Sequence, residues 1–297
     1  MTERCGFVAV VGAPNAGKST LVNAIVGQKV AIVSPKAQTT RTRLIGVAIA
    51  DQSQILLIDT PGIFDPKRRL DRAMVAAAWG GAQDADLIAL VVDAQTGVTK
   101  RVAPLIETLS QRREPKLVIL NKVDLCSKGT LLELATKLQE ALNPEDIFMV
   151  SASTGDGVGD LKAALAARVP EGPWHFPEEQ VSDATDRMLA AEVTREQLYL
   201  QLHAELPYDS AVETEKYEER KDGSVAIYQQ ILVARDTQRA IVLGHRGARL
   251  KEIGSRSREE LAKLLDRKVH LFLHVKVAEK WSDDRGLYRE IGLDWVD

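Results

Sequence analysis

Apolar and polar residues alternate in blocks along the first 170 residues. Six blocks are short and almost continuously apolar: FVAVVG (7–12), LIGVAIA (44–50), ILLIDT (55–60), DLIALVVD (86–93), KLVILN (116–121) and DIFMVSA (146–152). Such runs are typical of strands that are buried on both faces. Stretches with helical periodicity, about 10–15 residues long, separate the runs. This alternation predicts an α/β domain with a mostly parallel sheet and helices on both of its faces.

The pattern changes after residue 170. The segment VPEGPWHFPEEQVSD (169–183) contains three prolines and a glycine, which predicts a linker. Helical spacing follows over 184–206, and Asp-Gly within KDGS (221–224) predicts a β-hairpin. Helical segments around 241–254 and a strand at 268–277 complete a small α+β domain. We therefore expect a first domain at 1–170, a linker at 171–183 and a second domain at 184–297.

Composition adds little to this picture. Of the 297 residues, 45% are hydrophobic and 27% are charged, as in ordinary globular proteins. No apolar run reaches the 18 residues of a membrane span, and MTERCGFVAVVG lacks the features of a secretory signal. Cys5 and Cys126 form no CxxC pair, so we expect free thiols in a reducing compartment.

Charge is spread unevenly along the chain. Residues 170–219 carry 3 basic and 13 acidic side chains, whereas residues 220–297 carry 16 basic and 12 acidic ones. An acidic connector thus precedes a basic module. This asymmetry indicates a polyanionic partner for the last module.

GAPNAGKS (12–19) fits the phosphate-binding pattern G-x-x-x-x-G-K-[ST], between an apolar run and a helical one. Its glycines let backbone N–H groups curl around phosphate oxygens at a helix N-terminus. Lys18 is expected to reach the β- and γ-phosphates, and the Ser19 hydroxyl to bind Mg²⁺. The predicted nucleotide contacts in this loop are Asn15, Ala16, Gly17, Lys18, Ser19 and Thr20.

NKVD (121–124) indicates that the base is guanine, so that GTP and GDP are the expected nucleotides. The Asp124 carboxylate can accept hydrogen bonds from guanine N1–H and from the 2-amino group, which adenine does not offer as a pair. Asn121 is expected at the N7 side, where it would tie the loops together, and the stem of Lys122 along the ring. In SAS (151–153), which includes Ser151, the Ala152 N–H is expected to serve guanine O6.

DTPG (59–62) and the polar loop SPKAQTTRTRLIG (34–46) predict a switch governed by the γ-phosphate. Asp59 is expected to hold a Mg²⁺-bound water, and the Gly62 N–H to sense the γ-phosphate. The Thr40 hydroxyl is the candidate that completes the Mg²⁺ shell, with Thr39 as the alternative. The predicted metal set is therefore Ser19, Thr40 and Asp59.

Catalysis is expected to depend on Lys18, Thr40 and Gly62. Ile63 follows DTPG at a place where a Gln would orient the attacking water, and an isoleucine cannot polarise water. We therefore expect slow intrinsic hydrolysis of GTP to GDP and phosphate. Asn15 is a candidate ligand for K⁺ near the β–γ bridge; the alternative is that Asn15 only caps the loop.

GHRG (244–247) fits the G-x-x-G loop with which KH modules clamp single-stranded nucleic acid. The predicted RNA contacts are Gly244, His245, Arg246, Gly247, Arg249 and Lys251. The alternative is a plain turn between two core helices, because G-x-x-G alone is a weak signal. Its position between helical segments, before an apolar strand and within the basic module, favours RNA.

Taken together, these motifs resemble the Era family of bacterial GTPases, in the TrmE–Era branch. GAPNAGKSTLVNAIVGQKVAIVSPKAQTTRTRLIG, DTPG, NKVD and SAS are similar to its GTPase domain, and GHRGARLKEIGSRSREEL, VHLFLHVKV and Trp281 to its type II KH domain. The resemblance covers nearly the whole chain. It implies binding to the 3′ end of 16S rRNA, a role in 30S ribosomal subunit assembly, and a cytoplasmic protein with peripheral inner-membrane association.

Two other functions share the GTPase motifs. A GTPase of tRNA modification would carry a catalytic C-terminal cysteine or a folate-type domain, and neither is visible. A membrane-associated signalling or transport GTPase would carry a span or a lipidation motif, and the C-terminal IGLDWVD has no CaaX box. We expect a monomer.

Overall fold

The computed structural model describes residues 2–36, 39–41, 43–64, 66, 68–83, 85–203, 206–290 and 293–296. Residues 37, 38 and 42 of the predicted switch loop lie outside the described residues. The chain divides into two compact units. One contains residues 1–31, 40–183 and 296–297, and the other contains residues 32–39 and 184–295.

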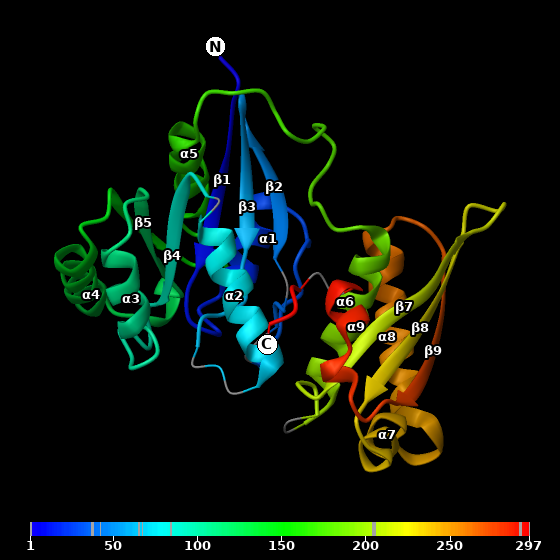
Figure 1. The fold of residues 1–297 in the computed structure, drawn as a ribbon. Coiled ribbons are helices and arrows are strands. Elements are labelled where there is room, and N and C mark those ends of the chain that lie inside the picture. Colours follow the sequence, from blue (N-terminus) through cyan, green and yellow to red (C-terminus); the bar gives the residue numbers. More distant parts are fainter. Residues whose placement is uncertain are drawn as a thin grey trace. The chain divides into compact units, whose positions relative to one another are not determined.

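The first unit is a six-stranded sheet of order β2-β3-β1-β4-β5-β6 (Figure 1). All neighbouring strands are parallel except β2 and β3. The strands are β1 (Arg4–Val11), β2 (Leu44–Ala50), β3 (Ser53–Asp59), β4 (Leu87–Asp93), β5 (Lys116–Asn121) and β6 (Asp146–Val150). The helices are α1 (Lys18–Val26), α2 (Arg69–Gln83), α3 (Ala103–Ser110), α4 (Lys128–Leu142) and α5 (Val158–Arg168).

Burial on both faces explains the continuous apolar runs. In β4, alternate residues enter two separate cores: Leu87, Ala89 and Val91 one of them, and Ile88, Leu90 and Val92 the other. Side chains of α1 and α5 complete the first core, and those of α2, α3 and α4 complete the second. The prediction of a mostly parallel sheet covered on both faces is confirmed.

The second unit has the predicted order helix–strand–strand–helix–helix–strand. Its elements are α6 (Asp186–Gln201), β7 (Ser210–Glu219), β8 (Val225–Val233), α7 (Asp236–Leu243), α8 (Ala248–Leu264) and β9 (Val269–Val277), followed by the short α9 (Arg285–Glu290). The sheet order is β7-β8-β9, with β7 antiparallel and β9 parallel to β8. Both outer strands are therefore edges of this sheet.

The Asp-Gly turn forms as predicted between β7 and β8. Arg220 N donates to Ser224 O (2.8 Å), and the Asp222 carboxylate accepts from Ser224 N. Gly223 has φ +79°, in the left-handed region that glycine occupies without strain. One face of the sheet packs on the helices, where Ile227 and Ile231 of β8 are fully buried.

The proline-rich segment after α5 packs against the first sheet. Cys5 N donates to Pro170 O (3.0 Å), Val47 N donates to Val181 O (2.8 Å), and Asp183 N donates to the carbonyl of the β2 residue Ile45 (3.1 Å). Aromatic side chains of this segment also cover a small apolar cluster on β1, β2 and β3. The segment predicted as a linker thus belongs to the first unit by its contacts as far as Asp183.

Gln54 fixes this segment in place. The side chain is fully buried in β3, and its Oε1 accepts from His175 N (2.9 Å) and Phe176 N (3.1 Å). Its Nε2 donates to Phe176 O (2.8 Å). Without the Gln54 side chain, these backbone groups would face a buried position with no hydrogen-bond partner there.

We predict that Gln54→Ala lowers the free energy of unfolding by about 2–4 kcal/mol, because it removes the partners of two N–H groups and one carbonyl. Urea denaturation of the full chain measures this loss. Gln52→Ala is the matched control, because Gln52 is exposed in the preceding turn. We expect the control to change stability by less than about 0.5 kcal/mol. Equal effects of the two substitutions would contradict the role of Gln54.

Candidate nucleotide and RNA sites

The carboxyl ends of β1, β3, β5 and β6 present the predicted nucleotide loops. Parallel strands bring these ends to one edge of the sheet, where open α/β sheets bind their ligands. The phosphate-binding loop follows β1, DTPG begins at the end of β3, and NKVD and SAS begin at the ends of β5 and β6. These four strands thus gather motifs that lie more than 100 residues apart.

The phosphate-binding loop is held in a conformation that demands glycine at its end. Gly17 has φ +93° and directly precedes α1, whose first turn contains Lys18, Ser19 and Thr20. A Cβ on Gly17 would lie 2.2 Å from Asn121 Nδ2, so no other residue fits there. Asn15 is also left-handed, with φ +64°. The loop therefore curls tightly, as phosphate binding requires.

Lys18 is 6% exposed, and its Nζ donates to Gly12 O (3.2 Å) and Ala13 O (3.1 Å). Burial lowers the pKa of Lys18 from its ordinary value to about 8, and the charge of Asp59 opposes this shift. The ammonium is thus desolvated and held at the loop, which strengthens its attraction for an incoming anion.

The structure brings together the three predicted metal ligands. Ser19 Oγ lies 2.8 Å from Thr40 Oγ1 and donates to Asp59 Oδ2 at 2.8 Å, while Thr40 Oγ1 donates to the same Asp59 oxygen at 3.0 Å. Thr39 instead offers its carbonyl to Arg195. Two hydroxyls and a fully buried carboxylate are hard oxygen donors, which fit Mg²⁺ completed by phosphate oxygens and water.

DTPG lies against the phosphate-binding loop. A Cβ on Gly62 would stand 2.8 Å from Pro14 N, so this close approach requires glycine. Ile63 N donates to Gly12 O (3.1 Å), and the Ile63 side chain is buried in the core beside α2 and α3. Ile63 therefore points into the hydrophobic interior and offers no polar group to a water molecule.

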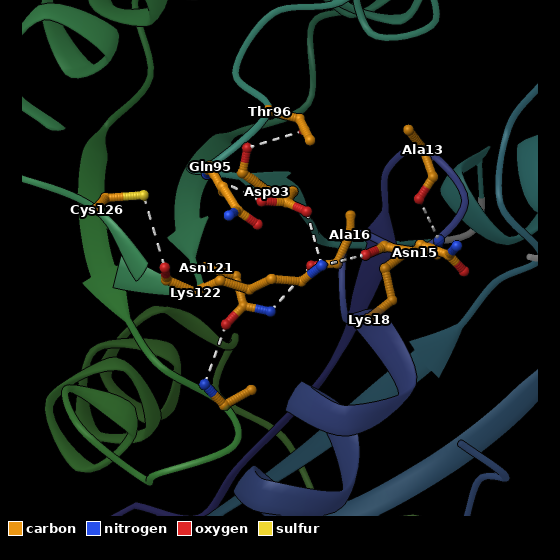
Figure 2. A network of polar contacts seen from close by, with 11 residues as sticks. Ala13, Asn15, Ala16, Lys18, Asp93, Gln95, Thr96, Asn121, Lys122 and Cys126 are labelled. Atoms are coloured by element: carbon orange, nitrogen blue, oxygen red, sulfur yellow. Dashed lines mark hydrogen bonds and ion pairs between the residues drawn. The ribbon is translucent and has the colours of Figure 1, made fainter. Parts of the chain in front are cut away.

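Asn121 connects three loops (Figure 2). Its side chain is 2% exposed; Nδ2 donates to Ala16 O (2.9 Å), and Oδ1 accepts from Ala152 N (3.0 Å). Ser151 is fully buried beside them, whereas Asp124 is exposed in the following turn. The Ala152 N–H, expected to serve guanine O6, is directed here to Asn121, so its base contact stays a prediction.

Lys122 joins the same network through an aspartate that no sequence motif predicted. Lys122 Nζ donates to Asn15 O (2.8 Å) and to Asp93 Oδ2 (2.7 Å), and Figure 2 shows the stem reaching across so that its terminal nitrogen meets both partners. Asp93 ends β4. The only sequence signal is its position after an apolar run, which many turn residues share.

GHRG forms a short turn between α7 and α8 in the second unit. Gly244 has φ +70° and Gly247 has φ +78°, and a Cβ on Gly244 would lie 2.7 Å from Arg249 Cβ. His245 and Arg246 between the glycines are exposed, as are Arg249 and Lys251 at the start of α8. The six predicted residues therefore form one exposed, cationic helix N-terminus.

A cleft of about 470 Å³ lies between α8 and the edge strand β9, and the sequence did not indicate it. Its lining includes Arg258, Lys268, His270 and Phe272. The Phe272 ring is 47% exposed and stacks on Tyr228 with ring centroids 4.7 Å apart. Cations beside an exposed aromatic ring are typical of surfaces that bind single-stranded nucleic acids.

Among the residues that the structure describes, no helix is long and apolar enough to cross a membrane.

Comparisons with known proteins match both domains. A family described as 50S ribosome-binding GTPase matches residues 7–122, and the KH domain family matches residues 205–282. The GTPase Era of Erythrobacter litoralis is 57% identical over all of both chains. That of Brucella suis is 56% identical and covers 98% of this chain and 94% of its own length.

Solved structures show the same two-domain fold. A variant of Aquifex aeolicus Era bound to GDP·AlF4⁻ has a TM-score of 0.92 and 36% identity, covering 97% of this chain and 99% of its own. An Era complex with MgGDPNP and nucleotides 1506–1542 of 16S ribosomal RNA has the same score and identity, covering 98% and 99%. Because the likeness spans the full chain and both domains, this protein is a GTPase with a KH domain and belongs to the GTPase Era family.

Proposed function

We propose that this GTPase binds the 3′ end of 16S rRNA through its KH domain and acts in assembly of the 30S ribosomal subunit. The observation that carries the proposal is the GHRG turn, with two positive-φ glycines around exposed His245 and Arg246. The solved Era complex with a 16S rRNA fragment supports the same partner for this chain. In this proposal the bound nucleotide determines when the RNA is held.

The RNA would contact two neighbouring parts of the KH domain. Its phosphates would lie at the N-terminus of α8, where backbone N–H groups and the helix dipole add to the charges of Arg246, Arg249 and Lys251. Its unstacked bases would lie at the cleft between α8 and β9, which Phe272 helps to line. Phosphate contacts would supply affinity, and base contacts would supply sequence preference.

In the GTPase domain, we propose the roles that the geometry supports. The backbone of the phosphate-binding loop, with Lys18, would hold the phosphates, and the Gly62 N–H would contact the γ-phosphate. Ser19, Thr40 and Asp59 would hold Mg²⁺ directly or through water; when bound, the ion neutralises charge on the β- and γ-phosphates. The solved complex with MgGDPNP supports this assignment.

Guanine would be selected by the loops that Asn121 connects. The exposed Asp124 carboxylate would accept from N1–H and the 2-amino group, while the stem of Lys122 would cover the ring. A base that covers the carboxylate but lacks this pair of donors would take it out of water without a hydrogen bond, which disfavours binding of that base.

We propose slow intrinsic hydrolysis, because Ile63 is buried and no glutamine follows DTPG. From the hydrophobic pattern we propose domains at 1–170 and 184–297 with the segment 171–183 between them, and we also propose a monomer. From the family resemblance we propose that the protein is located in the cytoplasm and in peripheral contact with the inner membrane. Fractionation of cells that produce the tagged full chain tests the location; recovery only in salt-resistant membrane pellets would contradict it.

Potassium is a candidate activator. Asn15 adopts a left-handed conformation in the phosphate-binding loop, and its side chain is proposed to bind K⁺ near the β–γ bridge, where the cation would offset developing charge. We predict severalfold faster phosphate release in KCl than in NaCl at equal ionic strength. Asn15→Ala should remove the difference. Equal rates in the two salts with the unmodified chain would contradict the prediction.

Nucleotide affinity should fall as the pH rises above 8. Lys18 has a pKa of about 8 in the structure, so part of it is neutral near that pH. Because phosphate favours the charged ammonium, nucleotide binding is accompanied by uptake of a proton by the neutral fraction. We predict uptake of about 0.2 protons per GDP at pH 7.5 and about 0.8 at pH 8.5, with about threefold weaker binding at the higher pH. Calorimetric titration in buffers of different ionisation enthalpy measures the uptake. The same uptake at both pH values would contradict the assignment.

The RNA proposal is tested with Gly247→Asp. The substitution places a carboxylate where a phosphate is expected, and no atom lies within 4 Å of the added Cβ, so the fold has room for it. We predict at least about tenfold weaker binding of labelled single-stranded RNA from the 3′ end of 16S rRNA, at one fixed salt concentration. Anisotropy titrations with GDP and with a non-hydrolysable GTP analogue give the affinities, and we expect the tighter binding with the analogue.

Gly223→Asp is the matched control. Gly223 has φ +79°, close to the +78° of Gly247, and equally open surroundings, but it lies in the β7–β8 turn. Both variants therefore carry the same backbone strain and added charge. If both variants bind RNA as tightly as the unmodified chain, GHRG is only a turn between two helices. That result would contradict the proposed ribosomal role and would leave the GTPase activity unaffected.

A further inference from the structure

Asp93 takes part in the nucleotide site without belonging to any motif. It ends β4 and lies opposite Asn121 in the register of β4 and β5. We propose that Asp93 is a positioning residue for nucleotide binding. Asp93 holds the Lys122 ammonium in a place where the lysine stem covers the base and an ammonium N–H donates to the carbonyl of Asn15. The inference rests on the proposed place of Lys122 against guanine.

The Asp93 side chain is itself fixed. Its Oδ1 accepts from Gln95 N (2.9 Å), and its backbone carbonyl accepts from Thr96 N (3.2 Å) and Gly97 N (2.9 Å), so a tight turn surrounds it. Oδ2 remains for Lys122 Nζ at 2.7 Å. The Asp93 side chain is 14% exposed. The carboxylate is therefore a rigid, largely desolvated anchor at the end of a core strand.

Lys122 needs such an anchor. Its backbone is left-handed, with φ +65°, and its four-carbon side chain would sample many rotamers in water. Asp93 on one side and the Asn15 carbonyl on the other restrict the ammonium to one place. A Cβ at Gly17 would stand 4.0 Å from Lys122 Cε, so the lysine stem runs along the phosphate-binding loop.

Two alternatives predict different behaviour. If the Asp93–Lys122 pair only stabilises the fold, its loss lowers stability and leaves nucleotide binding unchanged. If Asp93 positions Lys122, its loss weakens binding of GDP and GTP. The turnover number at saturating GTP is then preserved, because no contact links Asp93 with Lys18, Thr40 or Gly62 among the hydrogen bonds of the described residues.

The substitution Asp93→Asn distinguishes a positioning role of Asp93 from a purely stabilising one. It keeps the size of the side chain and an oxygen for Gln95 N–H, but it turns an amide donor toward the ammonium. We expect GDP to dissociate about tenfold faster, the effect of losing one charge-assisted hydrogen bond, and the KM for GTP to rise with it. We expect kcat to stay within about twofold. Displacement of a fluorescent GDP analogue and phosphate release by the full chain measure these quantities.

Two further variants control the result. Glu114→Gln breaks the Arg112–Glu114 pair, whose side chains are 16% and 27% exposed in the same unit, so it reports the loss of an ion pair outside the site. Asp93→Ser offers a hydroxyl to Gln95 N–H and removes the charge by another route. The positioning role predicts faster GDP dissociation in both Asp93 variants and unchanged dissociation in Glu114→Gln.

Lys122→Met completes the test. If Asp93 acts through Lys122, Asp93→Asn adds no further effect in the Lys122→Met background. Additive effects, or normal GDP dissociation in both Asp93 variants, would overturn the inference. If Lys122→Met alone leaves GDP binding unchanged, the proposed contact of Lys122 with the base fails instead. Faster dissociation in Lys122→Met but not in the Asp93 variants would overturn only the role of Asp93.

Discussion

The buried amide of Asn121 is the interaction on which the nucleotide site depends. One side chain donates to Ala16 in the phosphate-binding loop and accepts from Ala152 in the loop after β6. An amide is the side chain that can do both at once, because it carries a donor and an acceptor at a fixed separation. Gly17 is part of the same constraint, since any Cβ there would collide with the amide nitrogen.

The sheet makes this connection possible. Five parallel strands end at one edge, and their register places Asp93 beside Asn121 and Asn121 beside Val150. The central strands are buried on both faces, so their ends are held by two hydrophobic cores and not by the loops themselves. Loops mounted on such ends keep their polar groups in place without internal secondary structure, which favours precise binding.

The sequence predicts those parts of the molecule whose physical requirements restrict the residue types at neighbouring positions. Burial on both faces requires apolar side chains at successive positions, and the strands lie where these apolar runs occur. Gly17, Gly62 and Gly247 mark close approaches or left-handed backbone, so their motifs carry geometric information. Ser19, Thr40 and Asp59 come from three predicted motifs and meet within 3.0 Å.

Other features depend on partners that are distant in sequence, and these could not be predicted. Gln54 is a polar residue in a strand and gives no sign that it is fully buried against a segment 120 residues away. Asp93 resembles any acid at the start of a turn until Lys122 is seen beside it. The cleft between α8 and β9 is likewise a product of packing, because Phe272 lies within an ordinary apolar strand.

The uneven spread of charge along the sequence corresponds to different edges of the sheet in the second unit. The acidic residues of β7, which include Glu215 and Glu219, lie on one edge strand of the three-stranded sheet. Lys276 lies on the opposite edge strand, β9, and Lys268 directly precedes that strand at the cleft beside the basic helix α8. The basic edge is the one expected to attract a polyanion, whereas acids of β7 pair with neighbouring cations, as Glu219 does with Arg267 (3.1 Å). The acidic edge also protects β7 from pairing with other strands, because charged edge strands resist such association.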